Sequence, residues 1–388
     1  MNSPMTKDSS SIKGKRPVWI RVLAVALLVA IYFVIAALPS RTDERRDAED
    51  AVMKGLITAS LQSCLDTTAT AVAGMASISE VGSGKKPVSV LLTKYVDGPG
   101  YQDYGYYADR TPVVPGGIMQ TATLAYYLDQ GAVSLDKMLP TCQGILPELA
   151  RDAGSPLPDP HVVDYERTTG MDSISVREGF LKSYRYVTDR YVLDDLDPRR
   201  GPRHWSRYRG FMDILDRYFC TSDVYYVPPY YYRGPVKRSI ASICDGSGII
   251  LSHGQILQFY GSIANGGIRP AHRYFPKKRI CSEEVAQEMA DLLRMNVTRG
   301  TGALLKDCPV PVSGKAGAGI LDKGRVPRYG FIEEEGEVRV CSFVGFFPSD
   351  EPKYTLCVTL YFNDYPGYSL PALAFGDIVK GIMDKGLL

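Results

Sequence analysis

The chain has 388 residues, of which 45% are hydrophobic and 23% are charged, and its formal net charge is +2. A chain of this length can bury a large core. Its net charge is close to zero and therefore gives no indication of a nucleic acid or another strongly charged partner. Its eight cysteines include no Cys-x-x-Cys pair and its four histidines are scattered, so the sequence predicts no zinc or other metal site, and we expect no cofactor.

An apolar segment near the N-terminus predicts a membrane anchor. Residues 18–38 contain a single charged residue, Arg21, and their 21 positions match the roughly 20 that cross a bilayer as a helix. The segment ends in Ala-Ala-Leu-Pro, which is a poor cleavage site, so we favour an uncleaved anchor over a secretory signal.

The charge of the preceding tail predicts the orientation of this anchor. Residues 1–17 carry Lys7, Lys13, Lys15 and Arg16 against one acid, Asp8. Because positive flanks stay in the cytoplasm, we expect a cytoplasmic tail and a single pass through the inner or plasma membrane. Everything after the anchor is then periplasmic or extracellular, where disulfides are permitted.

Residues 39–66 predict a linking helix or stalk, and residues 67–388 predict one large domain. After a charged start, apolar residues recur at helical spacing from Val52 to Leu65. Two segments rich in small and β-branched residues follow at 68–79 and 88–97, and a glycine-containing turn separates them. This pattern predicts a β-hairpin. A helix is expected at 118–129, ended by Gly131.

The middle of the chain gives weaker signals. VREGFLKSY at 176–184 predicts a helix. Residues 198–234 are dense in Arg, Tyr and Pro, a mixture that can bind nucleic acid, but we expect this segment outside the membrane. We interpret it as an irregular surface insertion, with a glycan-binding or partner-binding surface as the alternative.

The C-terminal third predicts helices at 250–264, 283–296 and 370–385, the second capped by Ser282. Strands are expected at 338–347 and 354–362, where Cys341 and Cys357 would be small buried side chains. Helices between two strand hairpins indicate an α+β fold in which an antiparallel sheet is flanked by helices.

Four blocks of this region resemble a known family. They are DGSGIILSHGQILQFYGSIANGG (245–267), VTRGTGALL (297–305), VSGKAGAG (312–319) and SFVGFFPSDEPKYTLCVTLYF (342–362). They are similar to blocks of the penicillin-binding-protein transpeptidases, of the monofunctional, class B, division or elongation type. The resemblance covers residues 115–388 and implies the fold that these enzymes share with the serine β-lactamases.

The family's catalytic motif is not intact here. In the family, the serine of an SxxK motif attacks a D-alanyl carbonyl of a peptidoglycan stem peptide, and the lysine takes its proton. The resemblance places these positions on Gly117 and Gln120 of PGGIMQ (115–120). Glycine has no side-chain oxygen and an amide is not a base at neutral pH, so both catalytic positions are chemically blank.

Two further motifs are altered. The family's SxN is matched best by Ser183-Tyr184-Arg185, where an always-charged donor replaces the substrate-binding asparagine. Its KTG is matched by Lys315-Ala316-Gly317, which keeps the cation and loses the hydroxyl. The resemblance therefore implies Lys315, Ala316, Gly317 and Ser183 as substrate-binding positions, with two cations, Lys315 and Arg185, at the cleft.

The sequence thus predicts a membrane-anchored relative of the D,D-transpeptidases that is catalytically inactive. It would act in cell-wall synthesis or division by binding membrane proteins of that machinery or the stem peptide. One alternative is an active transpeptidase with a relocated nucleophile, for which Ser183, Ser313 and Thr121 are candidates. Another is an exported binding protein that has reused the fold outside wall synthesis.

Overall fold

The structure is a computed structural model in which the chain divides into two compact units, residues 1–51 and 52–388. The predicted anchor at 18–38 lies outside the described residues, as does most of the segment 198–234. Among the helices that are described, none is long and apolar enough to span a membrane. The described residues are 41–95, 99–141, 171–195, 215, 218–219, 236–271, 276–322, 337–364 and 367–388.

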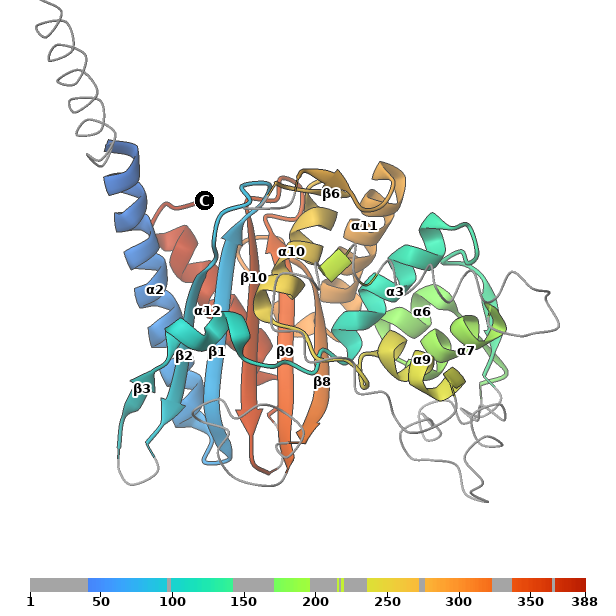
Figure 1. The fold of residues 1–388 in the computed structure, drawn as a ribbon, viewed down its shortest axis with the longest axis horizontal. Helices are drawn as coiled ribbons and strands as arrows, with labels where there is room; N and C mark the ends of the chain where they lie inside the picture. Colours follow the sequence, from blue (N-terminus) through green and yellow to red (C-terminus); the bar gives the residue numbers. More distant parts are fainter. Residues whose placement is uncertain are drawn as a thin grey trace, which may run out of the picture. The chain divides into compact units, whose positions relative to one another are not determined.

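A six-stranded antiparallel sheet organises the unit 52–388 (Figure 1). Both predicted hairpins are confirmed, and they join because β1 pairs with β10, with Ser77 opposite Cys357. In the order of the sheet the strands are β3 (Tyr101–Asp103), β2 (Val88–Lys94), β1 (Ala71–Glu80), β10 (Tyr354–Phe362), β9 (Glu337–Phe347) and β8 (Ser313–Asp322).

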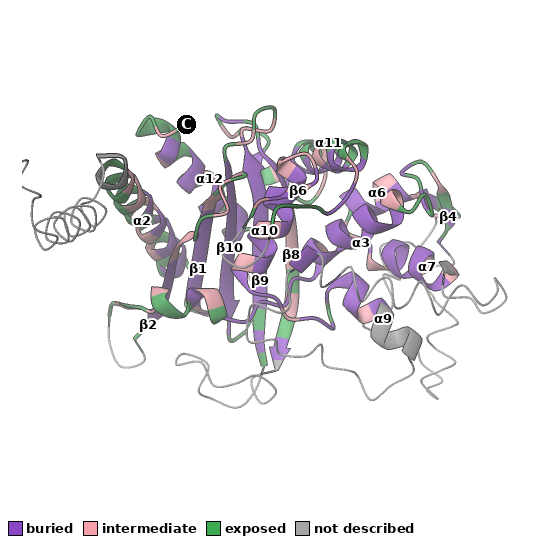
Figure 2. Ribbon diagram, turned by 45° about the horizontal axis from the view of Figure 1, so that its top comes forward, coloured by how far each residue is buried: buried purple, intermediate pink, exposed green. Residues whose placement is uncertain are grey.

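Both faces of this sheet are covered, which explains why its central strands are mostly buried. Every residue of β10 is buried (Figure 2). Successive side chains of a strand point to opposite faces. On β1, Met75 accordingly joins one hydrophobic cluster and Ala76 the other. Cys341 and Cys357 are buried and free, as predicted.

Two helices form the cluster on one face. Residues from Met53 onward in α2 (Arg41–Thr67) pack there with α12 (Leu370–Asp384). The range 39–66, which the sequence suggests as a linker, therefore contributes buried side chains such as Ile57 and Leu61 to the domain core.

The other face is covered by α10 (His253–Ala264), which is fixed to the sheet by a buried polar network. The imidazole of His253 lies 3.0 Å from Ser77 Oγ and 2.8 Å from Thr359 Oγ1. Burial lowers the pKa of His253 to about 3, so the ring is neutral in the folded protein. Ser252 caps this helix in a reciprocal pair with Gln255.

The remaining helices contribute to the same cluster, in which α11 packs against α10, and α3 packs against α7, α9 and α11. Their starts follow capping rules: the predicted cap Ser282 accepts a hydrogen bond from Val285 N, and Ser175 accepts one from Glu178 N. These helices are α3 (Gly117–Asp129), α6 (Val176–Leu181), α7 (Arg185–Asp195), α9 (Val236–Asp245) and α11 (Glu283–Arg299). Short elements complete the unit: β4 (Met138–Pro140), β5 (Ser173–Ser175), β6 (Ile268–Arg269), β7 (Lys278–Arg279), and the 3₁₀ helices η1 (Gly105–Arg110) and η5 (Ala303–Leu305).

Candidate functional site

The start of α3 lies directly against the edge strand β8. Gly116, just before α3, has a left-handed φ of 49°, and its amide donates to Gly246 O at 3.1 Å. A Cβ atom on Gly116 would lie 2.0 Å from Ala318 O, and one on Gly317 would lie 2.0 Å from Pro115 O. Only glycines allow this approach, so backbone meets backbone where α3 begins.

Gly117 faces the two other motif segments. A Cβ atom added there would lie 3.6 Å from Ser183 Oγ and 2.8 Å from Ala316 O. The structure therefore brings together the three segments that the sequence singled out, around position 117. It also fills the path of a longer side chain, because a Cβ contact below 3.0 Å requires β8 or α3 to move.

Ser183 lies in a tight bend between α6 and α7. Its φ of 54° is the only left-handed value at a non-glycine residue in the described part of the chain. Such a conformation costs about 1 kcal/mol or more and persists only where the surroundings enforce it. Here the bend is held by Ser183 N donating to Phe180 O and Tyr184 N donating to Gly179 O.

Lys315 of β8 donates a hydrogen bond from Nζ to Ser183 Oγ. The lysine is fully buried, and its Nζ lies 4.8 Å from the ring centroid of Phe180. Burial disfavours the charged form and lowers the pKa of Lys315 to about 7. The ammonium and the amine are thus both accessible forms near neutral pH.

Arg185 is directed to a different partner. Its Nε lies 3.2 Å from Asp245 Oδ2, and the other oxygen of that buried carboxylate accepts from Ser247 N at 2.7 Å. The guanidinium therefore forms an ion pair with the last residue of α9. Of the two cations expected at the cleft, Lys315 contacts Ser183 and Arg185 is neutralised by a carboxylate.

Gln120 occupies the buried side of α3. Its side chain is 1% exposed, and neither amide atom has a hydrogen-bond partner among the described residues. Burying an amide without a partner costs about 1–3 kcal/mol. At the position where the resembled family has a base, this chain therefore has a neutral amide that lacks hydrogen-bond partners among the described residues.

Asn296 and Thr301 support the site, and sequence reasoning missed both. Asn296 Nδ2 donates to Gly314 O at 2.8 Å, and its Oδ1 accepts from Thr301 N at 3.3 Å. Thr301 Oγ1 then lies 3.4 Å from Ser183 Oγ. The block VTRGTG that contains Thr301 was the only signal in the sequence, and it did not show this contact.

The other candidate nucleophiles are engaged in structural contacts. Ser313 Oγ lies 3.0 Å from Ser349 Oγ, and Thr121 Oγ1 lies 2.7 Å from Tyr260 OH. Among the described residues, no group of three His, Cys, Asp or Glu side chains could hold a metal ion. Of the site residues singled out from the sequence, Ser183 and Lys315 lie together beside position 117.

Residues 221–380 match the family model of the penicillin binding protein transpeptidase domain. This part of the chain is therefore similar to the transpeptidase domain of penicillin-binding proteins. The matched range includes β8 with Lys315, whereas Gly117, Gln120 and Ser183 precede it.

Solved structures of other proteins share this fold. The transpeptidase domain of penicillin-binding protein 3 from Burkholderia pseudomallei has a TM-score of 0.60 and 19% identity, covering 86% of this chain and 94% of its own. The transpeptidase domain of the FtsI4 D,D-transpeptidase from Legionella pneumophila has a TM-score of 0.56 and 16% identity, covering 86% and 96%. A peptidoglycan glycosyltransferase from Burkholderia ambifaria has a TM-score of 0.59 and 19% identity, covering 86% and 95%. A comparison with curated proteins finds no match.

Proposed function

We propose that this chain is a membrane-anchored penicillin-binding-protein-like protein that is catalytically inactive at the family's nucleophile position. It acts in peptidoglycan synthesis or division by binding other proteins. Structural relatives that are named as a D,D-transpeptidase and a peptidoglycan glycosyltransferase support a role in the cell wall. The apolar run at 18–38 supports an anchor.

The observation that carries this proposal is the environment of Gly117. A nucleophilic serine needs an oxygen that can reach a substrate carbonyl, and glycine has none. In addition, a Cβ atom at this position would lie only 2.8 Å from the carbonyl oxygen of Ala316. Loss of the nucleophile alone reduces turnover by roughly 10⁶ in well-studied hydrolases.

The same contacts favour protein partners over the stem peptide. Lys315, which would attract the carboxylate of a stem peptide, is fully buried and bonded to Ser183. Arg185 is paired with Asp245. A peptide carboxylate would have to displace these contacts and separate β8 from α3, so we place the binding function on the outer surface of the domain.

Labelling with a fluorescent penicillin tests the proposal. The full-length protein in detergent should show no covalent label after incubation, and an intact family transpeptidase treated in parallel serves as the positive control. Mass spectrometry of the intact protein should show no added mass. Rapid, stoichiometric acylation of the wild-type chain would overturn the assignment of an inactive protein.

A second candidate is favoured by one observation, the contact between Ser183 and Lys315. A lysine with a pKa near 7 can serve as a general base for a serine hydroxyl. With an activated ester, the Ser183 Oγ–acyl bond would form while the alcohol leaves, the serine proton passing through Lys315 to the leaving oxygen. Water would then hydrolyse the acyl-serine.

This candidate predicts an adduct at a defined residue. A p-nitrophenyl ester or β-lactam should then acylate Ser183, and Ser183→Ala and Lys315→Met should each abolish the adduct. Peptide mapping by mass spectrometry decides between the two functions. An adduct on Ser183 would establish Ser183 as a relocated nucleophile. An unmodified Ser183 under the same conditions would exclude this second candidate function.

A further inference from the structure

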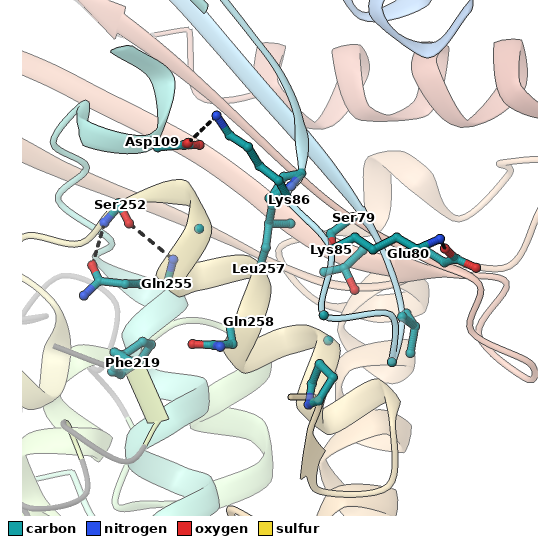
Figure 3. A pocket seen from close by; sticks show the side chains of 18 of the residues that line it. Ser79, Glu80, Lys85, Lys86, Asp109, Phe219, Ser252, Gln255, Leu257 and Gln258 are labelled. Atoms are coloured by element: carbon teal, nitrogen blue, oxygen red, sulfur yellow. Dashed lines mark hydrogen bonds and ion pairs between the residues drawn. The ribbon is translucent and has the colours of Figure 1, made fainter. Parts of the chain in front are cut away.

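A cavity lies between α10 and the connection from β1 to β2 (Figure 3). Its volume is about 560 Å³, which lies within the range of roughly 300–1,000 Å³ typical of ligand sites. Its walls come from residues 79–87, from one side of α10, and from Asp109 and Arg110 at the end of η1. None of the motif residues that meet around position 117 lines it, so the cavity is separate from the candidate site.

The wall formed by α10 leaves room for a side chain. A Cβ atom added to Gly254 would meet only Ser252 Oγ, at 3.8 Å, so the space beside this glycine is open. Leu257 and Pro87 give the lining apolar surface, and Gln258 adds an amide. An amide both donates and accepts hydrogen bonds. The cavity can therefore hold an apolar side chain while Gln258 bonds to the peptide backbone that carries it.

The charges of the lining favour an anionic partner. Its described residues include three cations, Lys85, Lys86 and Arg110, and two carboxylates, Glu80 and Asp109. Arg110 has an interaction of its own, so the lysines are the groups that would receive a ligand. Lys85 lies 3.4 Å from Glu80 and Lys86 lies 3.1 Å from Asp109, with lysine side chains 45% and 73% exposed. Exposed pairs of this kind are weak, so a ligand carboxylate can replace either acid.

Exposed tyrosines extend this surface along η1. Tyr106 is 79% exposed and Tyr107 is 44% exposed. In a 3₁₀ helix, side chains three positions apart lie in line with each other. Tyr106 is therefore in line with Asp109, and Tyr107 with Arg110, the two residues of η1 that line the cavity.

The tyrosine rings hold one another in place. Tyr106 meets Tyr107 edge to face, with ring centroids 5.4 Å apart. Tyr107 lies 6.4 Å from Tyr104, which packs against the hydrophobic core. Side chains that are already ordered lose little conformational freedom on binding, and tyrosine is enriched among the residues that dominate interface energies. The η1 tyrosines (Tyr104, Tyr106 and Tyr107) are thus arranged as anchors for a second protein.

We infer that the cavity and the η1 tyrosines form one docking surface for an extended, acidic segment of a partner protein. An apolar side chain of the segment fills the cavity beside Leu257, and its carboxylates meet Lys85 and Lys86. A ligand confined to the cavity would leave Tyr106 exposed, whereas a longer chain buries it. This inference rests on the proposed function, because it specifies the kind of partner that the inactive domain binds.

Fluorescence anisotropy on the full-length protein in detergent tests the inference. The probe is a short labelled peptide of alternating glutamate and leucine, and the matched peptide has glutamine in place of glutamate. We expect the acidic peptide to bind and the glutamine peptide to bind about threefold more weakly or less, as expected when exposed ion pairs are lost. Added salt should weaken binding of the acidic peptide, because it screens exposed charges.

Substitutions assign the binding to this surface. The double variant Lys85→Gln, Lys86→Gln should weaken binding about three- to tenfold, as expected for two exposed ion pairs. Tyr106→Ser should weaken it about tenfold, as expected for an aromatic anchor. Gly254→Leu should abolish it by filling the cavity. Because Tyr106 and both lysines are exposed, their variants remain usable if Gly254→Leu fails to fold.

A matched control separates this surface from general charge effects. Lys306→Gln with Lys380→Gln removes two exposed lysines at the end of η5 and on α12, and should leave binding unchanged. Absence of binding by the acidic peptide, or equal affinity for the glutamine peptide, overturns the inference. Equal binding by wild type and the lysine and tyrosine variants does the same.

A second copy of the chain is the competing occupant. Sedimentation would show it as a dimer that Tyr106→Ser dissociates, and that result would also overturn the inference. Penicillin labelling remains the separate test of the proposed function. An unlabelled protein that fails to bind the acidic peptide would contradict the docking surface alone, whereas a labelled protein would contradict the inactivity.

Discussion

At the scale of single residues, Lys315 is a cation held in surroundings that disfavour its charge. The fully buried side chain has a pKa near 7, against an ordinary value of 10.5 in the unfolded chain. Between these values the unfolded chain binds a proton that the folded protein does not. Folding is therefore opposed most strongly below pH 7, and stability from this group increases as the pH rises from about 7 to 10.5.

This linkage gives a testable difference between wild type and Lys315→Met. The variant is uncharged in both states, so its free energy of unfolding should exceed that of wild type at pH 7. The gap should narrow by up to about 1.4 kcal/mol per pH unit as the pH approaches 10. Urea unfolding at pH 7, 8, 9 and 10 measures it. A gap that is constant across this range would show that Lys315 keeps its charge when folded.

Two buried glutamines give a second, paired prediction. Gln120 has no hydrogen-bond partner among the described residues, whereas Gln255 accepts from Ser252 N at 2.9 Å. Gln120→Met should raise the free energy of unfolding by about 1 kcal/mol because the unsatisfied amide is removed. Gln255→Met should lower it by about the same amount because the capping box is lost. Destabilisation by Gln120→Met would mean that the amide of Gln120 has a partner.

The site residues that could be predicted from the sequence were those at the motif positions of the resembled family. The resemblance assigned Gly117 and Lys315 to one site, and the structure brings their segments together. It could not show that Lys315 contacts Ser183, which lies 132 positions away, or that Arg185 turns to Asp245. Contacts between distant side chains depend on packing that no local pattern encodes.

At the scale of elements, the junction of β8 and α3 is built from glycines. Gly317 of β8 lies so close to Pro115 that a methyl group would lie 2.0 Å from its carbonyl oxygen. The sequence predicts that Gly317 leaves room for a close backbone approach within its motif. That the approaching backbone is the segment at Pro115 and Gly116 could not be predicted, because the two segments are far apart in the chain.

Gly317→Ala should therefore destabilise the domain strongly, by about 3 kcal/mol or more, in the range of core overpacking. Gly55→Ala in α2 is the matched control, because nothing lies within 4 Å of its added methyl. In a helix interior this control should gain up to about 1 kcal/mol. Thermal unfolding compares the two variants. Similar melting temperatures would mean that β8 separates easily from α3 and that the cleft can open.

At the scale of the whole molecule, local signals identified the elements but not how the two ends of the domain meet. Alternation, turn residues and caps predicted both hairpins and the helices at 283–296 and 370–385, because each depends on neighbours in the chain. The pairing of β1 with β10 joins distant segments of the chain, for example Ser77 with Cys357, which are 280 positions apart. This pairing depends on the burial of both faces of the sheet. That burial is visible only in the folded structure.

The N-terminal residues predict how the whole chain would be oriented in a membrane. We expect residues 1–17 in the cytoplasm and residues 40–388 outside, because the basic tail resists translocation and the segment 18–38 is long enough to span the bilayer. Alkaline phosphatase fused after Leu388, which is active only when exported, should be active, and a fluorescent reporter that matures only in the cytoplasm should be dark. Replacing the four basic residues of the tail by glutamine should reduce the phosphatase signal, because the charge difference that sets the orientation is then lost. A bright cytoplasmic reporter on the wild-type chain would reverse the assignment and remove the domain from the compartment in which peptidoglycan is cross-linked.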